Sequence, residues 1–147
     1  PGSGSYSNST AIGYNATVTS SNAIQLGHSF TEVYHYGTLN SASDRRLKED
    51  IRETKYGLKS LLKLNPVDYR LKASGNNQIG FIAQEVKEIP ELTHVFKESE
   101  DDKPHGLQYT CIFVHAIKAL QELDEKVQER QAIITSLEEK IQTLENA

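Results

Sequence analysis

Two side chains that could form a catalytic pair lie five residues apart, the Ser43 hydroxyl and the Lys48 amine. Serine is a weak nucleophile until a neighbouring base takes its proton, and lysine can be that base only as the neutral amine. Arg45 and Arg46 stay positively charged, and a nearby like charge disfavours the protonated form of a lysine. The segment 43–48 is therefore compatible with nucleophile and base chemistry.

The same residue types also begin ordinary secondary structure. A Ser or Asp followed by a charged run is typical of a helix start or of a solvated turn. Asp44 could orient Lys48 or cap the turn that follows it, and the sequence leaves both roles open. This segment alone does not distinguish a catalytic pair from a helix start or a solvated turn. Other motifs in the chain are needed to do so.

Length and charge narrow the classes of function. A chain of 147 residues is one ordinary domain or a small domain with extensions. Its formal net charge of -4 gives no general attraction to nucleic acid or to an anionic membrane. We expect neither a membrane span nor a signal peptide, since no apolar run approaches the required length. The single cysteine, Cys111, excludes a disulfide within the chain.

Nothing in the sequence predicts a metal or a cofactor. The histidines show no ligand spacing, and the acidic run 98–102 is typical of a solvated loop. A triad of Ser43 with a histidine, such as His35, is an alternative to a lysine base. We expect no cofactor.

The N-terminal part has the composition of a thin β-structured shaft. Residues 1–5 are small and typical of a linker, and residues 6–42 are rich in Ser, Asn, Thr and Gly. The runs 11–16 and 22–27 are related, with Ile12 and Ile24 twelve residues apart, which favours a β-solenoid-like segment over a polar linker. Residues 30–39 alternate bulky and polar side chains, which predicts one or two short strands.

The middle of the chain alternates helical and strand patterns. Apolar residues in 55–64 follow helical spacing, and Pro66 stops further winding. The stretches 67–71 and 78–82 flank the turn-forming cluster 74–77, which predicts a β-hairpin. Shorter elements are expected as a helix over 83–86 and as strands over 92–96 and 107–109.

The C-terminal residues 110–147 predict one long helix with a heptad seam. Arg130 is the polar seam position, and we expect its stem to cover apolar surface while its head stays in water. Lys126 and Lys140 lie at g positions and acidic residues lie at e positions, so neighbouring helices would present opposite charges beside the seam. Branched residues at a with Leu at d favour a parallel dimer by packing preference. The seam is Phe113, Ala116, Leu120, Leu123, Val127, Ile134, Leu137, Ile141 and Leu144.

Three sequence blocks occur together in a recognisable order. They are 43–51 (Ser-Asp-Arg-Arg-Leu-Lys-Glu-Asp-Ile), 80–86 (Gly-Phe-Ile-Ala-Gln-Glu-Val), and Tyr109 leading into 116–118 (Ala-Ile-Lys). From Ser43 to the C-terminus the chain resembles the C-terminal intramolecular chaperone and auto-processing domain of phage tailspikes, tail fibres and endosialidases. It is also similar to the self-cleaving segment of a membrane-bound myelin transcription regulator.

The resemblance implies a role for several residues. Ser43 corresponds to the nucleophile and Lys48 to its general base, with cleavage of the bond between Ala42 and Ser43. Asn76 and Gly80 correspond to supporting positions: an amide for the oxyanion and a close backbone approach. Asn76, like Asn77 beside it, is also an ordinary turn residue. Asp44 and Arg46 are further supporting candidates.

The resemblance also implies an architecture. We expect an α+β fold: a globular chaperone and auto-processing domain over 43–109 with β-hairpins and short helices, then a coiled-coil helix over 110–147. Family members are intertwined homotrimers, and three-fold symmetry of the upstream fibre favours a trimer over a dimer. The expected partners are two further copies of the chain and its own upstream fibre portion, with no nucleic acid or membrane.

Two functions remain open from the sequence. In the first, the chain drives trimerisation and folding of an upstream tail fibre or tailspike in the host cytoplasm, then releases itself by cutting before Ser43. The mature fibre would remain on the virion tail. In the second, the chain is a permanent trimerisation or attachment tip of a fibre or trimeric adhesin, and Ser43 and Lys48 are surface residues.

Overall fold

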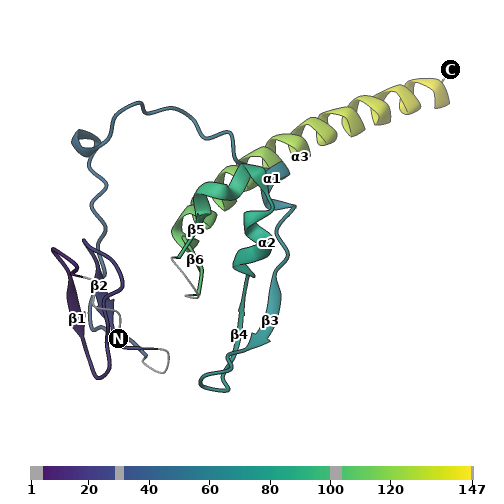
Figure 1. Cartoon of the computed structure of the whole chain (residues 1–147). Helices are drawn as coiled ribbons and strands as arrows, with labels where there is room; N and C mark the ends of the chain where they lie inside the picture. Colours follow the sequence, from purple (N-terminus) through teal and green to yellow (C-terminus); the bar gives the residue numbers. More distant parts are fainter. Residues whose placement is uncertain (1–4, 29–31, 100–103, 147) are drawn as a thin grey trace. The chain divides into compact units, whose positions relative to one another are not determined.

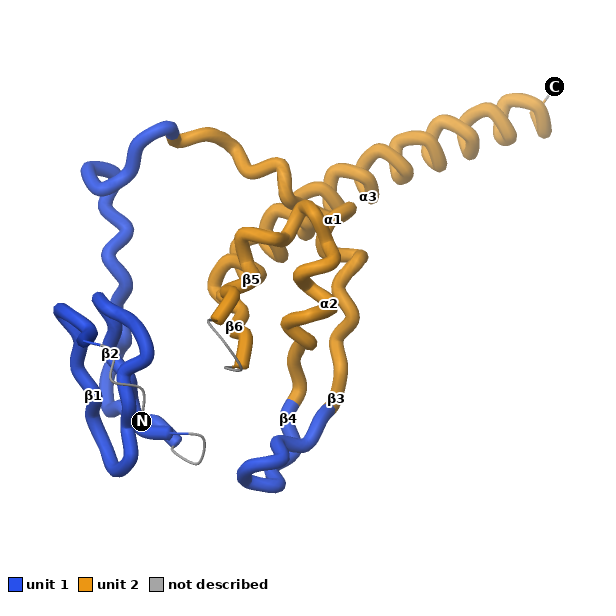
Figure 2. The backbone as a smooth tube through the Cα atoms, viewed as in Figure 1, with its two compact units in different colours: residues 1–50, 69–78 blue, residues 51–68, 79–147 orange. Residues whose placement is uncertain are grey.

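The computed structural model describes residues 5–28, 32–99 and 104–146, and it is a mixed α and β structure with a long C-terminal helix (Figure 1). The chain is divided into two compact units (Figure 2). Unit 1 comprises residues 1–50 and 69–78, and unit 2 comprises residues 51–68 and 79–147. Among the described residues, no helix combines the length and the apolar character that a membrane span requires.

Unit 1 contains a parallel pair of short strands, β1 (Thr10–Ile12) and β2 (Ile24–Leu26). Thr10 pairs with Ile24 and Ile12 pairs with Leu26. Polar side chains repeat with the strands, since Asn8 Nδ2 donates to Asn22 Oδ1 at 2.8 Å across a separation of 14 residues. The repeat is therefore fourteen residues, not the twelve that matching Ile12 with Ile24 predicts.

The conformation of two asparagines explains this register. Asn8 and Asn22 both have positive φ values, 52° and 57°, which Asn tolerates better than other non-glycine residues. Asn8 and Asn22 therefore occupy equivalent positions before β1 and β2, which agrees with the strand register of 14 residues. Gly13 follows β1 at φ 114°, and a Cβ there would lie 3.4 Å from the Gly27 Cα, so the two turns approach closely.

Residues 32–39 form no strand, although the alternation over 30–39 predicts one; Phe30 and Thr31 lie outside the described residues. The physical reason is that the bulky side chains of this segment pack against no other part of the described structure. Val33, Tyr34, Tyr36 and Leu39 are all exposed. An alternating pattern stabilises a strand only where one face packs against something else.

The hairpin predicted over 67–82 is present, as β3 (Val67–Arg70) paired with β4 (Asn77–Gly80). The turn between them is closed by backbone hydrogen bonds: Leu71 N–H donates to the Asn76 carbonyl at 2.9 Å, and Gly75 N–H donates to the Leu71 carbonyl at 2.8 Å. Gly75 adopts φ 76°, a conformation that side chains rarely allow. The predicted helix after the hairpin is α2 (Ala83–Lys87).

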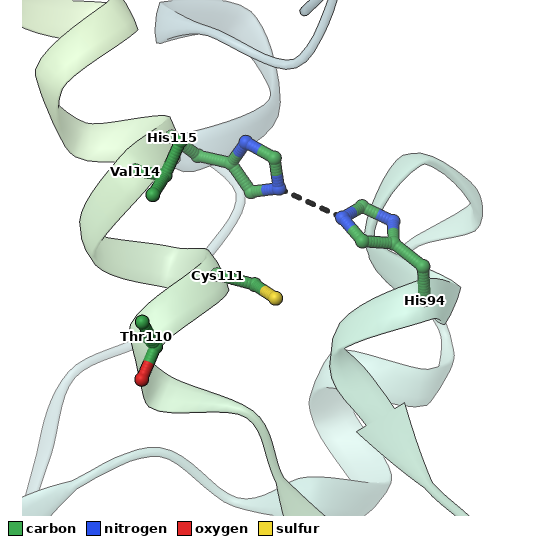
Figure 3. A pocket seen from close by; sticks show the side chains of 5 residues that line it. All are labelled: His94, Thr110, Cys111, Val114 and His115. Atoms are coloured by element: carbon green, nitrogen blue, oxygen red, sulfur yellow. Dashed lines mark hydrogen bonds between the residues drawn. The ribbon is translucent and has the colours of Figure 1, made fainter. Parts of the chain in front are cut away.

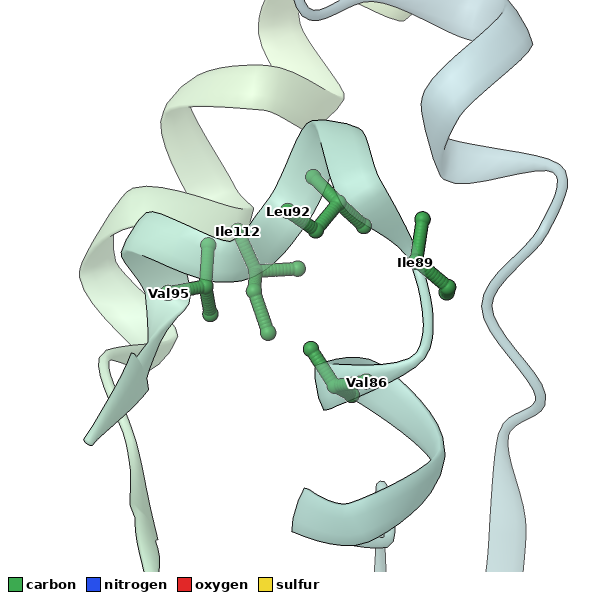
Figure 4. Close-up of a cluster of buried hydrophobic side chains, with 5 residues drawn as sticks. All are labelled: Val86, Ile89, Leu92, Val95 and Ile112. Atoms are coloured by element: carbon green, nitrogen blue, oxygen red, sulfur yellow. The ribbon is translucent and has the colours of Figure 1, made fainter. Parts of the chain in front are cut away.

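The core of unit 2 is small and is completed by the C-terminal helix. Its buried side chains come from α2, from the 3₁₀ helix η2 (Pro90–Val95) and from α3 (Tyr109–Glu145) (Figure 4). Leu92 and Val95 have no exposed surface. The buried cluster consists of Val86, Ile89, Leu92, Val95 and Ile112. The partly buried residues packed against it are Leu64, Phe81, Leu107 and Cys111.

The expected strand over 92–96 is mostly the 3₁₀ helix η2, so that prediction is wrong. Pro90 occupies the start of η2, where its fixed φ favours helical geometry. Leu92 and Val95 lie three residues apart, the spacing that aligns side chains along a 3₁₀ turn, and both are buried. The strand that follows is only β5 (Phe96–Lys97), antiparallel to β6 (Gly106–Leu107). Residue 109, expected at the end of a strand, begins α3.

The helix predicted over 55–64 is reduced to α1 (Leu58–Leu61). Gly57 stands at its N-cap with non-helical backbone angles, and it cannot supply a side-chain cap. The Glu122 carboxylate of α3 takes that role, because its Oε2 accepts from Leu58 N–H at 2.8 Å. Lys118, one turn earlier on α3, forms an ion pair with Glu53.

The long helix α3 is confirmed over 109–145, a length of about 55 Å at the usual rise per residue. Its first turns pack on the core through Ile112, His115 and Ala119, which are buried. Beyond them the predicted seam is exposed, from 46% at Leu123 to 76% at Leu144.

We expect Gly57→Ala to remove the cap that Glu122 gives to α1. An added Cβ would lie 2.3 Å from Glu122 Oε1, so this carboxylate must move away from Leu58 N–H. The free energy of unfolding should fall by about 1 kcal/mol, the usual contribution of a helix cap. Chemical denaturation followed by circular dichroism measures it.

A double-mutant cycle isolates the cap. In a Glu122→Ala background, Gly57→Ala should cost much less, because no carboxylate is left to displace. Gly106→Ala is a control, since its nearest neighbour, the Lys97 Cβ, lies at an ordinary 3.8 Å. An equal cost of Gly57→Ala in both backgrounds would show that Glu122 is not what the new methyl group meets.

Candidate functional site

Ser43 and Lys48 lie on either side of one short turn, the 3₁₀ helix η1 (Arg45–Leu47). The backbone closes the turn through two hydrogen bonds, from Leu47 N–H to the Asp44 carbonyl at 3.0 Å and from Lys48 N–H to the Arg45 carbonyl at 3.1 Å. Lys48 leaves the turn in an extended conformation, with φ -129° and ψ 139°. The turn thus sets the separation of the two ends of the segment.

The structure brings the Ser43 and Lys48 side chains together. Lys48 Nζ donates to Ser43 Oγ at 2.7 Å. The same contact, with the proton on oxygen and a neutral amine, is the geometry a general base needs to take the serine proton. Both residues are exposed in the single chain. The arrangement can therefore activate a hydroxyl once the amine is neutral and water is excluded.

Asp44 caps the turn. Its Oδ1 accepts from Arg46 N–H at 2.8 Å, which is the N-cap hydrogen bond. The same carboxylate binds the Arg46 side chain, with Nε at 3.0 Å from Oδ1 and Nη2 at 2.8 Å from Oδ2. Of the two roles that the sequence leaves open for Asp44, the structure has the capping one. The Arg46 guanidinium is occupied by Asp44.

This pairing changes the pKa of both partners. Hydrogen bonds from the Arg46 side chain, and then from its backbone N–H, lower the pKa of Asp44 below its usual value. The hydrogen bond to Asp44 raises the pKa of Arg46 in turn. Both groups lie at the surface, so the pair contributes geometry to the turn more than stability to the fold.

The other predicted site residues have local partners. Asn76 lies in the hairpin turn, where its N–H donates to Ser74 Oγ at 3.3 Å, and Gly80 ends β4. Within the described residues, no hydrogen bond joins either one to Ser43 or Lys48. His35 Nδ1 lies 3.2 Å from the Gly37 carbonyl.

Two of the sequence blocks meet within unit 2. Phe81 N–H donates to the Tyr109 hydroxyl at 3.2 Å, and the two rings are 6.0 Å apart. Phe81 belongs to the block 80–86, and Tyr109 begins the block that continues into α3. The Tyr109 hydroxyl accepts the backbone N–H of Phe81, which lies between β4 and α2, so this contact joins the two blocks in the structure.

A contact between two histidines, the buried His115 and the exposed His94, is absent from the sequence-based predictions. The two residues lie 21 positions apart on different elements, so no spacing rule links them. Their Nε2 atoms are 2.7 Å apart. Within the described ranges, no three His, Cys, Asp or Glu side chains gather as they would around a metal ion.

We expect Asp44 to titrate below the usual Asp value of about 3.9, which also applies to the unfolded chain. Because the folded pKa is lowered, the cap is fully present above about pH 4 and is lost as the pH falls through that lowered pKa. Carbon-13 NMR of the carboxyl group measures the titration. Arg46→Gln should return the pKa of Asp44 toward its usual value, whereas Arg45→Gln should not, and equal titrations in both variants would contradict the assigned pair.

The segment that contains Ser43 and Lys48 is similar to a known protein family. No curated protein matches the chain significantly. Residues 43–98 match the sequence profile of a family described as chaperone of endosialidase, whose name, Peptidase S74, indicates a serine peptidase kind of activity. The match begins at Ser43 and ends just after β5. Residues 43–98 are therefore similar to the chaperone of endosialidase family, and the match supports an intramolecular chaperone domain in this segment.

Proposed function

We propose that the chain is a self-cleaving intramolecular chaperone, which cuts its own backbone between Ala42 and Ser43. The observation that carries this proposal is the 2.7 Å contact between Lys48 Nζ and Ser43 Oγ, at the first residues of the family match. Ser43 is the nucleophile and Lys48 the general base. The domain is also the folding template of a fibre, tailspike or related protein upstream of it.

The chemistry balances without a cofactor. The neutral Lys48 amine takes the proton of the Ser43 hydroxyl, and the oxygen attacks the Ala42 carbonyl carbon, in its own chain or in a neighbouring one. The peptide C–N bond then breaks, and the Ser43 nitrogen leaves as an amine after it receives the proton from Lys48. Water hydrolyses the resulting ester, which gives the Ala42 carboxylate and restores the serine hydroxyl.

The exposed dyad needs further groups before it can react efficiently. A tetrahedral oxyanion requires hydrogen-bond donors, and water must be kept from the amine. Asn76 and Gly80 remain the candidates for the oxyanion, while the guanidinium of Arg46 is engaged by Asp44. Assembly of several chains would supply shielding, which makes cleavage follow correct association.

The exposed face of α3 supports assembly. Apolar residues along its predicted seam, Leu120, Leu123, Val127, Ile134, Leu137, Ile141 and Leu144, are all exposed in the single chain. A helix of this length with so little packing is stabilised mainly by burying its apolar face. We propose that three copies of the chain form a parallel coiled coil along this face, because a three-fold fibre requires a three-fold template.

The short, exposed strands of the N-terminal part support the proposal of a removable folding template. The strands β1 and β2 are three residues each and expose Ile12, Ile24 and Leu26, so they need further coils or neighbouring chains. Long-range strand pairing is slow and exposed to aggregation. A trimeric chaperone would hold three such chains in register. Cleavage would then leave a fibre that is kinetically trapped.

In this proposal the domain acts in the host cytoplasm while virions assemble. The mature fibre stays on the virion tail, and the chaperone part is released. The second candidate function is a permanent trimerisation or attachment tip, which the exposed α3 face supports equally well. Only the contact of Lys48 with Ser43 separates the two candidates.

We expect the purified protein to separate into residues 1–42 and 43–147 during incubation near neutral pH. Intact-mass spectrometry under denaturing conditions detects both fragments. Ser43→Ala removes the nucleophile and should abolish cleavage. Lys48→Arg should abolish it too, because arginine can donate the same hydrogen bond but does not lose its proton.

Ser41→Ala is the matched control, since it changes a nearby serine and should cleave like the wild type. Cleavage in Lys48→Arg would exclude Lys48 as the base. A full-length wild-type chain that is trimeric would leave the permanent tip as the function.

We expect Leu137→Asp to dissociate the assembly. A carboxylate placed in a buried seam loses its hydration without gaining a partner. Analytical ultracentrifugation should show three chains in the wild type and single chains in the variant at the same concentration. Ser136→Asp places the same charge outside the seam and should remain trimeric. A wild type with two chains would instead support the dimer favoured by packing preference.

A further inference from the structure

His94 and His115 connect the two elements that close the core of unit 2. His94 lies on η2 and His115 on α3, and their Nε2 atoms are 2.7 Å apart (Figure 3). His115 is 6% exposed, whereas His94 reaches the surface. Tyr56, from the segment before α1, stacks on His94 at 4.8 Å and meets His115 edge-on at 5.4 Å. Three separate segments therefore converge on the pair.

The geometry limits how many protons the pair can hold. With the two Nε2 atoms facing each other, one nitrogen donates and the other accepts. One extra proton can be accommodated, because a charged imidazole still donates to a neutral partner. Two charged imidazoles would place N–H against N–H at this distance, so the contact cannot survive double protonation.

A backbone hydrogen bond at Tyr56 raises the pKa of His115, but less than burial and the neighbouring His94 lower it. Charged side chains on the packed segments have other partners: Glu53 pairs with Lys118, Glu91 with Lys63, and Glu122 accepts from Leu58 N–H. Lys59 on α1 and Lys55 beside Tyr56 are positive. In the described part of the chain, no carboxylate hydrogen-bonds to either imidazole. The pocket beside the pair, about 190 Å³, is lined by His94, Thr110, Cys111, Val114 and His115.

We propose that His94 and His115 form an acid-labile contact that holds the first turns of α3 on η2 near neutral pH and opens when both rings take up protons. Burial lowers the pKa of His115, and the neighbouring His94 lowers it further. Opening would also release the ring of Tyr56, and with it the segment that leads into α1. This device is separate from the proposed cleavage, and it regulates how firmly α3 is docked.

The sign of the pH dependence follows from the lowered pKa. An unfolded histidine takes up a proton near about pH 6.5, while the folded His115 stays neutral to lower pH. Stability is therefore greatest above that value and falls as the pH decreases, until His115 protonates in the folded state. Over this window one extra proton in the unfolded state raises the unfolding constant by up to about tenfold per pH unit.

Chemical denaturation between pH 7.5 and 5.2 tests the proposal on the whole chain with Ser43→Ala, which remains uncut. We expect the unfolding constant of the parent chain to rise as the pH falls. His115→Gln replaces the buried imidazole with a neutral donor and should remove most of that rise. His35→Gln removes a histidine of unit 1 and should retain it. An equal pH dependence in all three chains would overturn the proposal.

Nitrogen-15 NMR of the histidine rings provides a second measurement on the unmutated pair, which does not depend on how well a variant folds. At pH 6.5, the ordinary histidine value, we expect His115 to be mostly neutral and to show a scalar coupling across the N–H···N contact. Loss of that coupling on further acidification should coincide with increased hydrogen exchange in the first turns of α3. A fully charged His115 at pH 6.5 with α3 still docked would overturn the proposal.

Discussion

Burial of Ile112 against the segment 86–95 is the interaction on which unit 2 depends (Figure 4). The other four members of the buried cluster come from that segment, in which α2 and η2 are too short to bury a core by themselves. The first turns of α3 provide the missing surface. A core of this size supports only marginal stability. The helix α3 thus has two parts: its first turns complete the core, and the apolar face of its later turns is exposed.

The candidate site is built differently, because it depends on local structure alone. Ser43 and Lys48 are joined through one turn and its cap, and all the hydrogen bonds that define it lie within residues 43–48. Such a turn can form before any core does. What a turn cannot supply is a dry environment or an oxyanion donor. In the proposed mechanism, the turn would bring the two side chains together, and the surrounding structure would determine when they can react.

Local signals in the sequence predicted the elements that depend on local structure. The hairpin around Gly75, the helix α2 and the long helix α3 follow from turn residues and periodicity, whereas the pairing of Ser43 with Lys48 was implied by the family resemblance. Predictions failed where a distant contact decides the outcome. The strand expected over 92–96 is η2, whose Leu92 and Val95 belong to the cluster that Ile112 of α3 completes, and the helix expected over 55–64 begins only at Leu58, where Glu122 caps it. The pairing of His94 with His115 has no local signal.

The asparagine pair in unit 1 has a consequence for how the upstream part could vary. Asn8 and Asn22 occupy equivalent positions of successive turns and bond to each other, so the spacing of 14 residues is fixed by backbone conformation as well as by strand pairing. A coil added on this register would repeat both features. Insertions or deletions of fourteen residues would then preserve the strand register and the equivalent positions of the asparagines. If the residues upstream continue this repeat, the segment could differ in length between related proteins without any change of its local structure.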